Sequence, residues 1–238
     1  MAKVNWDNTG DRYFEMGVNQ GVLYVQNKDG TYGDAVAWNG LTGVTESPEG
    51  AEPTDLWADN IKYATLRSAE TFGGTIEAYT YPDEFMQCDG SGSPVVDDAA
   101  VLGIRIGQQE RKAFGLCYRT AIGNDVDPSG KDYLLHLVYG ATASPSEKAY
   151  ETINDSPDAI TFSWEFTTNP VKIAGEAYKD FKPVSTIVID SRKFSEVADK
   201  AKLDALEDLL YGTDASGNDQ GTTGTLPAPD VVISTLTA

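Results

Sequence analysis

Few residues of this sequence have the types and spacing that catalysis requires. His136 is the only histidine, so a Ser-His-Asp triad or a metal site with several histidines would have to be built around this one residue. It alternates with Leu134 and Val138 along a predicted strand, which is typical of a histidine packed against a sheet. The 37 acidic residues make chance carboxylate pairs unavoidable, and a glycosidase pair is recognised only by its separation in space. The sequence therefore favours a protein that is not an enzyme and needs no cofactor.

One loop has part of the spacing of a calcium site. Asp125, Asp127 and Ser129 fall on positions 1, 3 and 5 of an EF-hand loop, and Gly130 falls on position 6. Position 12, which should be a bidentate Glu, is His136, and a strand pattern follows where the EF-hand needs a helix. We therefore interpret the segment as a polar hairpin loop and predict no metal site.

Composition argues against several classes of protein. The chain has 238 residues and a formal net charge of -19, which would repel the phosphate backbone that nucleic-acid-binding proteins neutralise. No apolar run approaches the ~18–20 residues of a membrane span, and the first residues lack the apolar core of a signal peptide. Cys88 and Cys117 are the only cysteines and have no C-x-x-C spacing, so two free thiols are expected. We expect neither membrane insertion nor nucleic-acid recognition.

The elements that would position any site are mainly strands. Residues 160–167 alternate between apolar and polar side chains, with Phe162, Trp164 and Phe166 on one face. Turn signals such as Asp29-Gly30 and Asn39-Gly40 separate many such segments, which indicates a β-sandwich or barrel. Strands are predicted over residues 21–26, 41–46, 75–81, 101–108, 114–122, 133–139, 160–167, 171–177, 184–190 and 229–234.

One segment has helical spacing instead. Leu203, Leu206 and Leu210 recur on one helical face, and Gly212 follows as a stop signal, which predicts one flanking helix over about 197–211. A shorter helical turn is predicted over residues 82–88. The whole chain, 1–238, is expected to form a single domain with an N-terminal arm over about 1–12 and a C-terminal extension over about 212–238.

Charge is unevenly distributed along the chain. Residues 46–61 contain five acids and no basic residue. Four basic residues follow close together further along, namely Arg105, Arg111, Lys112 and Arg119. Opposite charges on different parts of one surface favour association between copies through complementary patches, so this basic cluster is a candidate for subunit contacts.

Several short strings are spread over nearly the whole chain. They are Val36 to Thr42, Thr45 to Glu52, Ala58 to Tyr63, Ile76 to Phe85, Gly107 to Gln109, Tyr139 to Ala141, Ser144 to Glu147, Asn154 to Pro157 and Leu209 to Asp214. Together these strings resemble the major tail protein, or tail tube protein, of long-tailed bacteriophages and related prophages. The resemblance rests on their number and order rather than on any catalytic motif.

This resemblance implies a specific role. It implies a tail-tube-type β-sandwich or barrel with one flanking helix, six subunits in a ring, and rings stacked into a hollow tube through which genomic DNA passes without specific binding. The implied partners are other copies of the chain, a tape-measure protein, and tail-terminator or tail-tip proteins. The implied location is the virion tail, after synthesis in the bacterial cytoplasm. A loop in the acidic segment would reach an adjacent ring; its candidate residues are Glu46, Pro48, Glu49, Glu52, Pro53, Asp55 and Trp57.

Two other functions stay open at this stage. Trp38 or Trp57 could stack on a sugar, which would suit a carbohydrate-binding or adhesion module of a virion. A glycan-cleaving enzyme on a β-sandwich has only the surplus of carboxylates in its favour.

Overall fold

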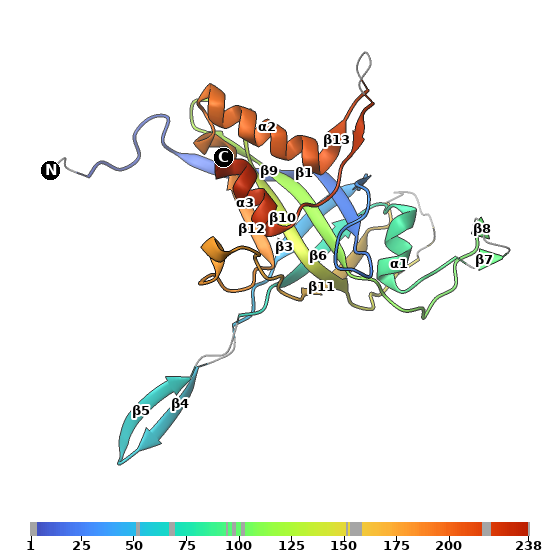
Figure 1. The fold of residues 1–238 in the computed structure, drawn as a ribbon, viewed down its shortest axis with the longest axis horizontal. Helices are drawn as coiled ribbons and strands as arrows, with labels where there is room; N and C mark the ends of the chain where they lie inside the picture. Colours follow the sequence, from blue (N-terminus) through green and yellow to red (C-terminus); the bar gives the residue numbers. More distant parts are fainter. Residues whose placement is uncertain are drawn as a thin grey trace.

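The computed structural model describes residues 4–50, 53–66, 70–93, 95–96, 99–100, 103–150, 152, 159–215 and 220–237. Its main element is an eight-stranded antiparallel sheet with the order β2-β1-β9-β10-β11-β6-β3, in which β12 also pairs with β10 (Figure 1). The strands are β1 (Tyr13–Val25), β2 (Val36–Ala37), β3 (Leu41–Glu46), β6 (Gly73–Ala78), β9 (Phe114–Asn124), β10 (Asp132–Ala143), β11 (Phe162–Thr168) and β12 (Thr186–Asp190). The prediction of a mainly β protein is confirmed.

The sheet rolls up without closing into a barrel. Register shifts interrupt β1 between Met16 and Val22, and β10 between Val138 and Ala141, and such bulges bend a strand and increase its twist. Gly140, at φ +61°, allows one of these bends, because a Cβ there would lie 2.4 Å from the carbonyl oxygen of Asn169. Trp38 N donates to Gly21 O at 2.8 Å and so continues the pairing of β2 with β1. In the described chain, however, no ladder joins β3 to β1.

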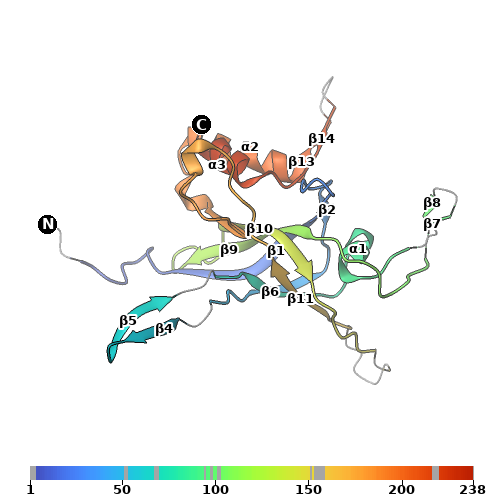
Figure 2. The same cartoon turned by 60° about the horizontal axis from the view of Figure 1, so that its bottom comes forward.

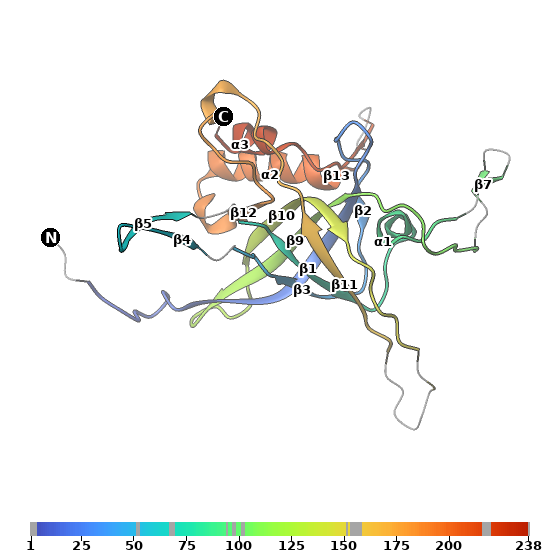
Figure 3. The same ribbon diagram turned by 90° about the horizontal axis from the view of Figure 1, so that it is seen from below.

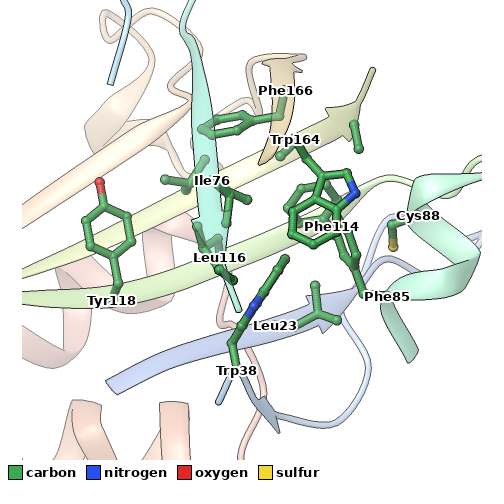
Figure 4. Packing of buried hydrophobic residues seen from close by; sticks show 14 residues of the cluster. Leu23, Trp38, Ile76, Phe85, Cys88, Phe114, Leu116, Tyr118, Trp164 and Phe166 are labelled. Carbon is green, nitrogen blue, oxygen red and sulfur yellow. The ribbon is translucent and has the colours of Figure 1, made fainter. Parts of the chain in front are cut away.

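An aromatic core fills the inside of the roll (Figure 4). Trp164 and Phe166 point inward from β11, as their alternation predicts, and are 1% and 2% exposed. A short helical plug, η1 (Asp83–Phe85) and α1 (Met86–Asp89), places Phe85 against Trp164 with ring centroids 5.2 Å apart. Such pairs of tilted rings contribute stability beyond that of buried area. The plug confirms the predicted helical turn over 82–88.

Two helices cover the outer face of the sheet (Figure 2). The helix α2 (Val197–Tyr211) buries Leu203, Leu206 and Leu210 against β1, β9 and β10, as its spacing predicts. The helix α3 (Pro229–Thr237) lies beside α2 and buries Val232. The prediction of one flanking helix over 197–211 is therefore right for α2 and incomplete, because a second helix flanks the sheet.

Three predicted strands are wrong. Residues 229–234 belong to α3, because Pro229 and Asp230 supply a good helical first turn and the short apolar run fits either period. Residues 171–177 contain only a bridge between Val171 and Val184, followed by the 3-10 helix η2 (Glu176–Tyr178). Of residues 101–108, positions 101 and 102 lie outside the described chain, and the rest contains one bridge, from Ile106 to Gly92.

Small two-stranded units project from this body (Figure 1). They are β4 (Thr54–Ala58) with β5 (Ile61–Leu66), β7 (Val95–Val96) with β8 (Ala99–Ala100), and β13 (Gly212–Thr213) with β14 (Thr222–Thr223). A further 3-10 turn, η3 (Ser191–Lys193), follows β12.

Candidate assembly surface

The acidic segment after β3, predicted over 46–61 as a long loop, contains a projecting β-hairpin made of β4 and β5. The strands β4 and β5 pair through a turn at Asp59 and Asn60, whose φ angles of 51° and 63° are left-handed. Asp and Asn tolerate this conformation better than other residues with a side chain, which suits a two-residue hairpin turn. Asp55 forms an ion pair with Lys62 across the hairpin at 2.7 Å. The acidic residues of the segment therefore include at least one that is neutralised within the chain.

The hairpin is joined to the sheet by a narrow base. The backbone N–H groups of Glu49 and Thr71 each donate to the carbonyl of the other at 2.7 Å, and Ser47 N donates to Gly73 O at 2.8 Å. The chain between Glu49 and Thr71 therefore leaves and returns to the sheet at one place. We call residues 50–70 the excursion.

Large apolar side chains are exposed on the hairpin. Trp57 is 68% exposed and Tyr63 is 73% exposed, and neither covers a core of the chain. Ile61 and Leu66 on β5 are also exposed. Of the predicted loop residues, Pro48, Glu49, Pro53, Asp55 and Trp57 are exposed as expected, whereas Glu52 lies outside the described residues. The apolar side chains of β5 were missed because the acidic residues, not the apolar ones, singled out this segment.

The N-terminal arm also exposes large apolar side chains. Residues 4–12 precede β1 and contain Trp6, which is 76% exposed, and Val4, which is 62% exposed. The arm contacts the body through Gly10, whose N–H donates to Asp125 Oδ1 at 3.0 Å and whose carbonyl accepts from Asn124 Nδ2 at 3.1 Å. The hairpin and the arm extend from the same side of the body in Figure 1.

Glu46 has a different environment from the other predicted loop residues. It ends β3, and its Oε1 accepts a hydrogen bond from Tyr118 OH at 2.6 Å and lies 3.1 Å from His136 Nδ1. The rings of His136 and Tyr118 stack with centroids 4.6 Å apart. Thr120 Oγ1 lies 3.1 Å from the other ring nitrogen of His136. The hydrogen bond with His136 is the largest influence on Glu46, and it holds the pKa of this carboxyl below its usual range.

His136 is 8% exposed, so its predicted packing against the sheet is confirmed. The order Thr120, His136 and Glu46 has the donor and acceptor sequence of a catalytic triad, but Tyr118 covers one face of the imidazole and also occupies Glu46. The group is best explained as a partly buried polar network that fixes the end of β3.

The four basic residues do not form one cluster. Arg119 lies on the outer face, where its Nη2 forms a 2.7 Å ion pair with Glu207 of α2 and its Nε donates to Tyr211 OH at 3.2 Å. Its guanidinium also lies over the ring of Tyr133, 4.2 Å from the centroid. With a side chain only 14% exposed, Arg119 attaches α2 to the sheet. Alternation along the strand could have assigned it to that face.

The other three basic residues lie on the side of α1. Arg105 pairs with Asp83 at 3.1 Å, Lys112 donates to Gln87 Oε1 at 2.6 Å, and the guanidinium of Arg111 lies against Gly90. The expectation that opposite charges meet between copies therefore concerns these three residues alone.

The calcium-like loop connects β9 to β10 as a polar hairpin loop. Asp125 accepts from the backbone of Gly10, while Asp127 accepts from Ser129 N and forms a 2.9 Å ion pair with Lys131. The hydrogen bond from the Ser129 side chain, followed by the one from Lys131, lowers the pKa of Asp127 to about 2. Among the described residues, no three His, Cys, Asp or Glu side chains gather in a way that could hold a metal ion.

Comparisons with known proteins find similarity at the level of solved structures. No family model matches the chain, and no curated protein does. The cap that terminates the tube of the anti-feeding prophage is 7% identical with a TM-score of 0.35, over 80% of this chain and 95% of that chain. Two components of an extracellular contractile injection system in its extended state, PVC, are 11% identical with TM-scores of 0.30. The match to the sheath/tube terminator covers 70% of this chain and 96% of that chain. The match to the sheath-tube complex covers 79% of this chain and 94% of that chain.

These values are low, so the role proposed below rests on the sequence strings and on the surface of this chain. Two further observations bear on it. Trp38 is 3% exposed and its indole donates to Thr80 O at 3.1 Å, which removes one of the two candidate sugar-stacking residues. No helix in the described ranges is long and apolar enough to cross a membrane.

Proposed function

We propose that this chain is a structural protein of a bacteriophage tail that associates with copies of itself into rings, which stack into the tail tube. One observation carries the proposal: large apolar side chains are exposed on segments that project from a well-packed body. Trp6, Trp57 and Tyr63 are each more than two-thirds exposed. Exposed apolar surface of this kind marks an interaction site, and the resemblance of the sequence strings to those of tail tube proteins supports other copies of the same chain as the partner.

The resemblance supplies the details of the assembly. Six subunits close into a ring, the hairpin β4–β5 reaches an adjacent ring, and DNA passes through the bore without specific binding. Its other partners are a tape-measure protein and tail-terminator or tail-tip proteins. The chain is located in the virion tail after synthesis in the bacterial cytoplasm. The net charge of -19 suits such a conduit, because fixed cations along the bore would hold the DNA by counterion release. The role requires no enzymatic activity.

Electron microscopy of the purified protein tests the proposal. We expect rings or tubes at micromolar concentration and a rising sedimentation coefficient as concentration rises. A protein that stays monomeric at every concentration and salt would contradict it.

One observation favours a second function, a carbohydrate-binding or adhesion module of a virion. Trp57 and Tyr63 present two exposed aromatic rings on one hairpin, and such rings can stack on sugars. Glycan binding that is lost in Trp57→Ala, by a protein that forms no rings, would favour this function over the tube.

A further inference from the structure

A polar pocket lies beside the helical plug. Its volume is about 550 Å³, and its walls are the end of α1, residues 107–111, residues 145–148 and β11. Residues from four separate segments therefore meet around one opening. None of the functions considered above uses this pocket.

Two buried donors in its walls have no acceptor. Trp164 Nε1 and Arg111 Nε are both buried and have no hydrogen-bond partner in the described chain. An indole and a guanidinium can only donate, and a buried donor without an acceptor destabilises the fold. Figure 4 shows the indole nitrogen of Trp164 on the side of the ring nearer Cys88 of α1. Both donors therefore call for an oxygen acceptor.

The backbone is built to hold the arginine in place. Gly90, at φ +86°, has no side chain, and a Cβ there would lie 2.7 Å from Arg111 Nη2 and 2.8 Å from its Cζ. Gln109 N donates to Gly90 O at 2.8 Å, which fixes the two segments together. The guanidinium therefore packs against the backbone of Gly90, in space that a side chain at this position would occupy.

The charges around the pocket leave one cation unneutralised. Lys148 Nζ pairs with Asp89 Oδ2 at 2.9 Å, and the Asp89 side chain is 4% exposed. Arg111 forms no ion pair within the described residues. In a chain of net charge -19, a pocket with a fixed, unpaired guanidinium selects a carboxylate, which can accept from more than one donor at once.

We propose that this pocket binds the carboxylate of Asp59 from a second copy of the chain. Asp59 lies at the exposed turn of the hairpin and, unlike Asp55, has no cation partner in the described chain. The hairpin and α1 lie on opposite sides of the body in Figures 1 and 3. Contacts between opposite sides of identical subunits are head-to-tail and repeat from copy to copy. Gln109 lines the pocket and is exposed, so it marks the place where the carboxylate would enter.

This inference rests on the proposed function and adds a receptor for the hairpin. Disulfide cross-linking between two copies tests the contact directly. In the double variant A58C/Q109C, which keeps Asp59 and places one cysteine beside it, we expect mild oxidation to give dimers and longer ladders on a non-reducing gel. The matched control is A58C/E176C, because Glu176 is also exposed but lies in η2, away from the pocket. The native Cys88 and Cys117 are buried and should not contribute.

A second test asks whether Arg111 and Asp59 promote tube formation through the same contact. Arg111→Gln and Asp59→Asn should each raise the protein concentration needed for tube formation by about tenfold or more. The double variant should be no worse than either single one, because both remove the same contact. Lys179→Gln is the control, since it removes the same charge from an exposed cation beside η2, outside the pocket and outside the candidate basic residues, and it should have little effect. Melting temperatures of the unassembled proteins check that each variant folds.

The outcomes separate the two proposals. If wild-type protein forms tubes but A58C/Q109C cross-links no more than A58C/E176C, and the effects of Arg111→Gln and Asp59→Asn add, the pocket contact is wrong and the tube role stands. If wild-type protein forms neither rings nor tubes, the tube role is wrong. The cross-link in concentrated protein then decides the pocket contact by itself.

Discussion

At the scale of single residues, the network around Glu46 links the sheet to the excursion. Glu46 is the last residue of β3, and the excursion begins four residues later. Its carboxylate is held by Tyr118 and His136, and Thr120, which contacts His136, also donates to Glu15 Oε2 at 3.4 Å. The titratable groups of this network are therefore Glu15, Glu46, Tyr118 and His136.

The lowered pKa of Glu46 predicts a pH-dependent contribution to stability. A carboxyl whose pKa is lower in the folded than in the unfolded chain, where it is about 4.3, stabilises the fold above that value. The contribution disappears as pH falls through the folded pKa. We expect Glu46→Gln to lower the melting temperature at pH 6 and to match wild type at the acidic end of the titration.

Thermal unfolding between pH 6 and pH 3 measures this difference. Glu77→Gln is the control, because it removes an exposed carboxylate from neighbouring β6. A gap between wild type and Glu46→Gln that stays constant with pH would show that the network does not depend on the charge of Glu46.

At the scale of elements, the docking of α2 depends on its leucine face and on Arg119. Leu206 is fully buried between α2 and the sheet, so Leu206→Asp should destabilise the protein by several kcal/mol, because it buries an unpaired charge. Exposed Asp208→Ala on the same helix is a control that should change stability little. Urea unfolding measures both, and a Leu206→Asp protein as stable as wild type would mean that α2 is not docked.

Because its two ends meet at a narrow base, the excursion can be removed without disturbing the sheet. Glu49 and Thr71 already exchange two hydrogen bonds, so replacing residues 50–70 with Asn-Gly should close a two-residue hairpin there. We expect a folded protein with a melting temperature near that of wild type, because the described excursion adds nothing to the core. It should form no tubes, because the hairpin contact is lost.

Sedimentation and electron microscopy check this outcome. A second variant, Trp57→Ala with Tyr63→Ala, keeps the hairpin and removes its two most exposed rings, and it should assemble more weakly than wild type. Normal tubes from the shortened chain would refute the role assigned to the hairpin.

At the scale of the whole molecule, the net charge of -19 per chain sets how assembly responds to salt. Repulsion between acidic subunits is screened over about 8–10 Å near physiological ionic strength. Tubes should therefore form more readily as salt rises, the bore should be acidic, and duplex DNA should bind weakly throughout. A salt series of sedimentation with a gel-shift assay tests this; tubes that dissolve at higher salt, or tight DNA binding at low salt, would contradict it.

The parts of the fold that alternate over a long distance could be predicted from the sequence, and the short ones could not. Period-2 patterns located β9, β10 and β11, and leucine spacing located α2, because these elements bury one face. The segment 229–234 gives too few residues to separate a helix from a strand. The hairpin β4–β5 was missed because both its faces are exposed, which leaves no alternation to detect. The pocket beside α1 combines four segments that only the rolled sheet brings together.

The order of the elements along the chain also affects how the protein folds during synthesis. The eight strands of the main sheet all precede α2 and α3, so the ribosome delivers the complete sheet before it delivers the helices that cover its outer face. Until then Leu135, Leu137 and Tyr139, which are fully buried in the finished protein, face water. Nascent chains with such an uncovered apolar face are prone to aggregate and are bound by chaperones. Slow synthesis through residues 191–210 should therefore lower the yield of soluble protein more than slow synthesis anywhere after α3 begins.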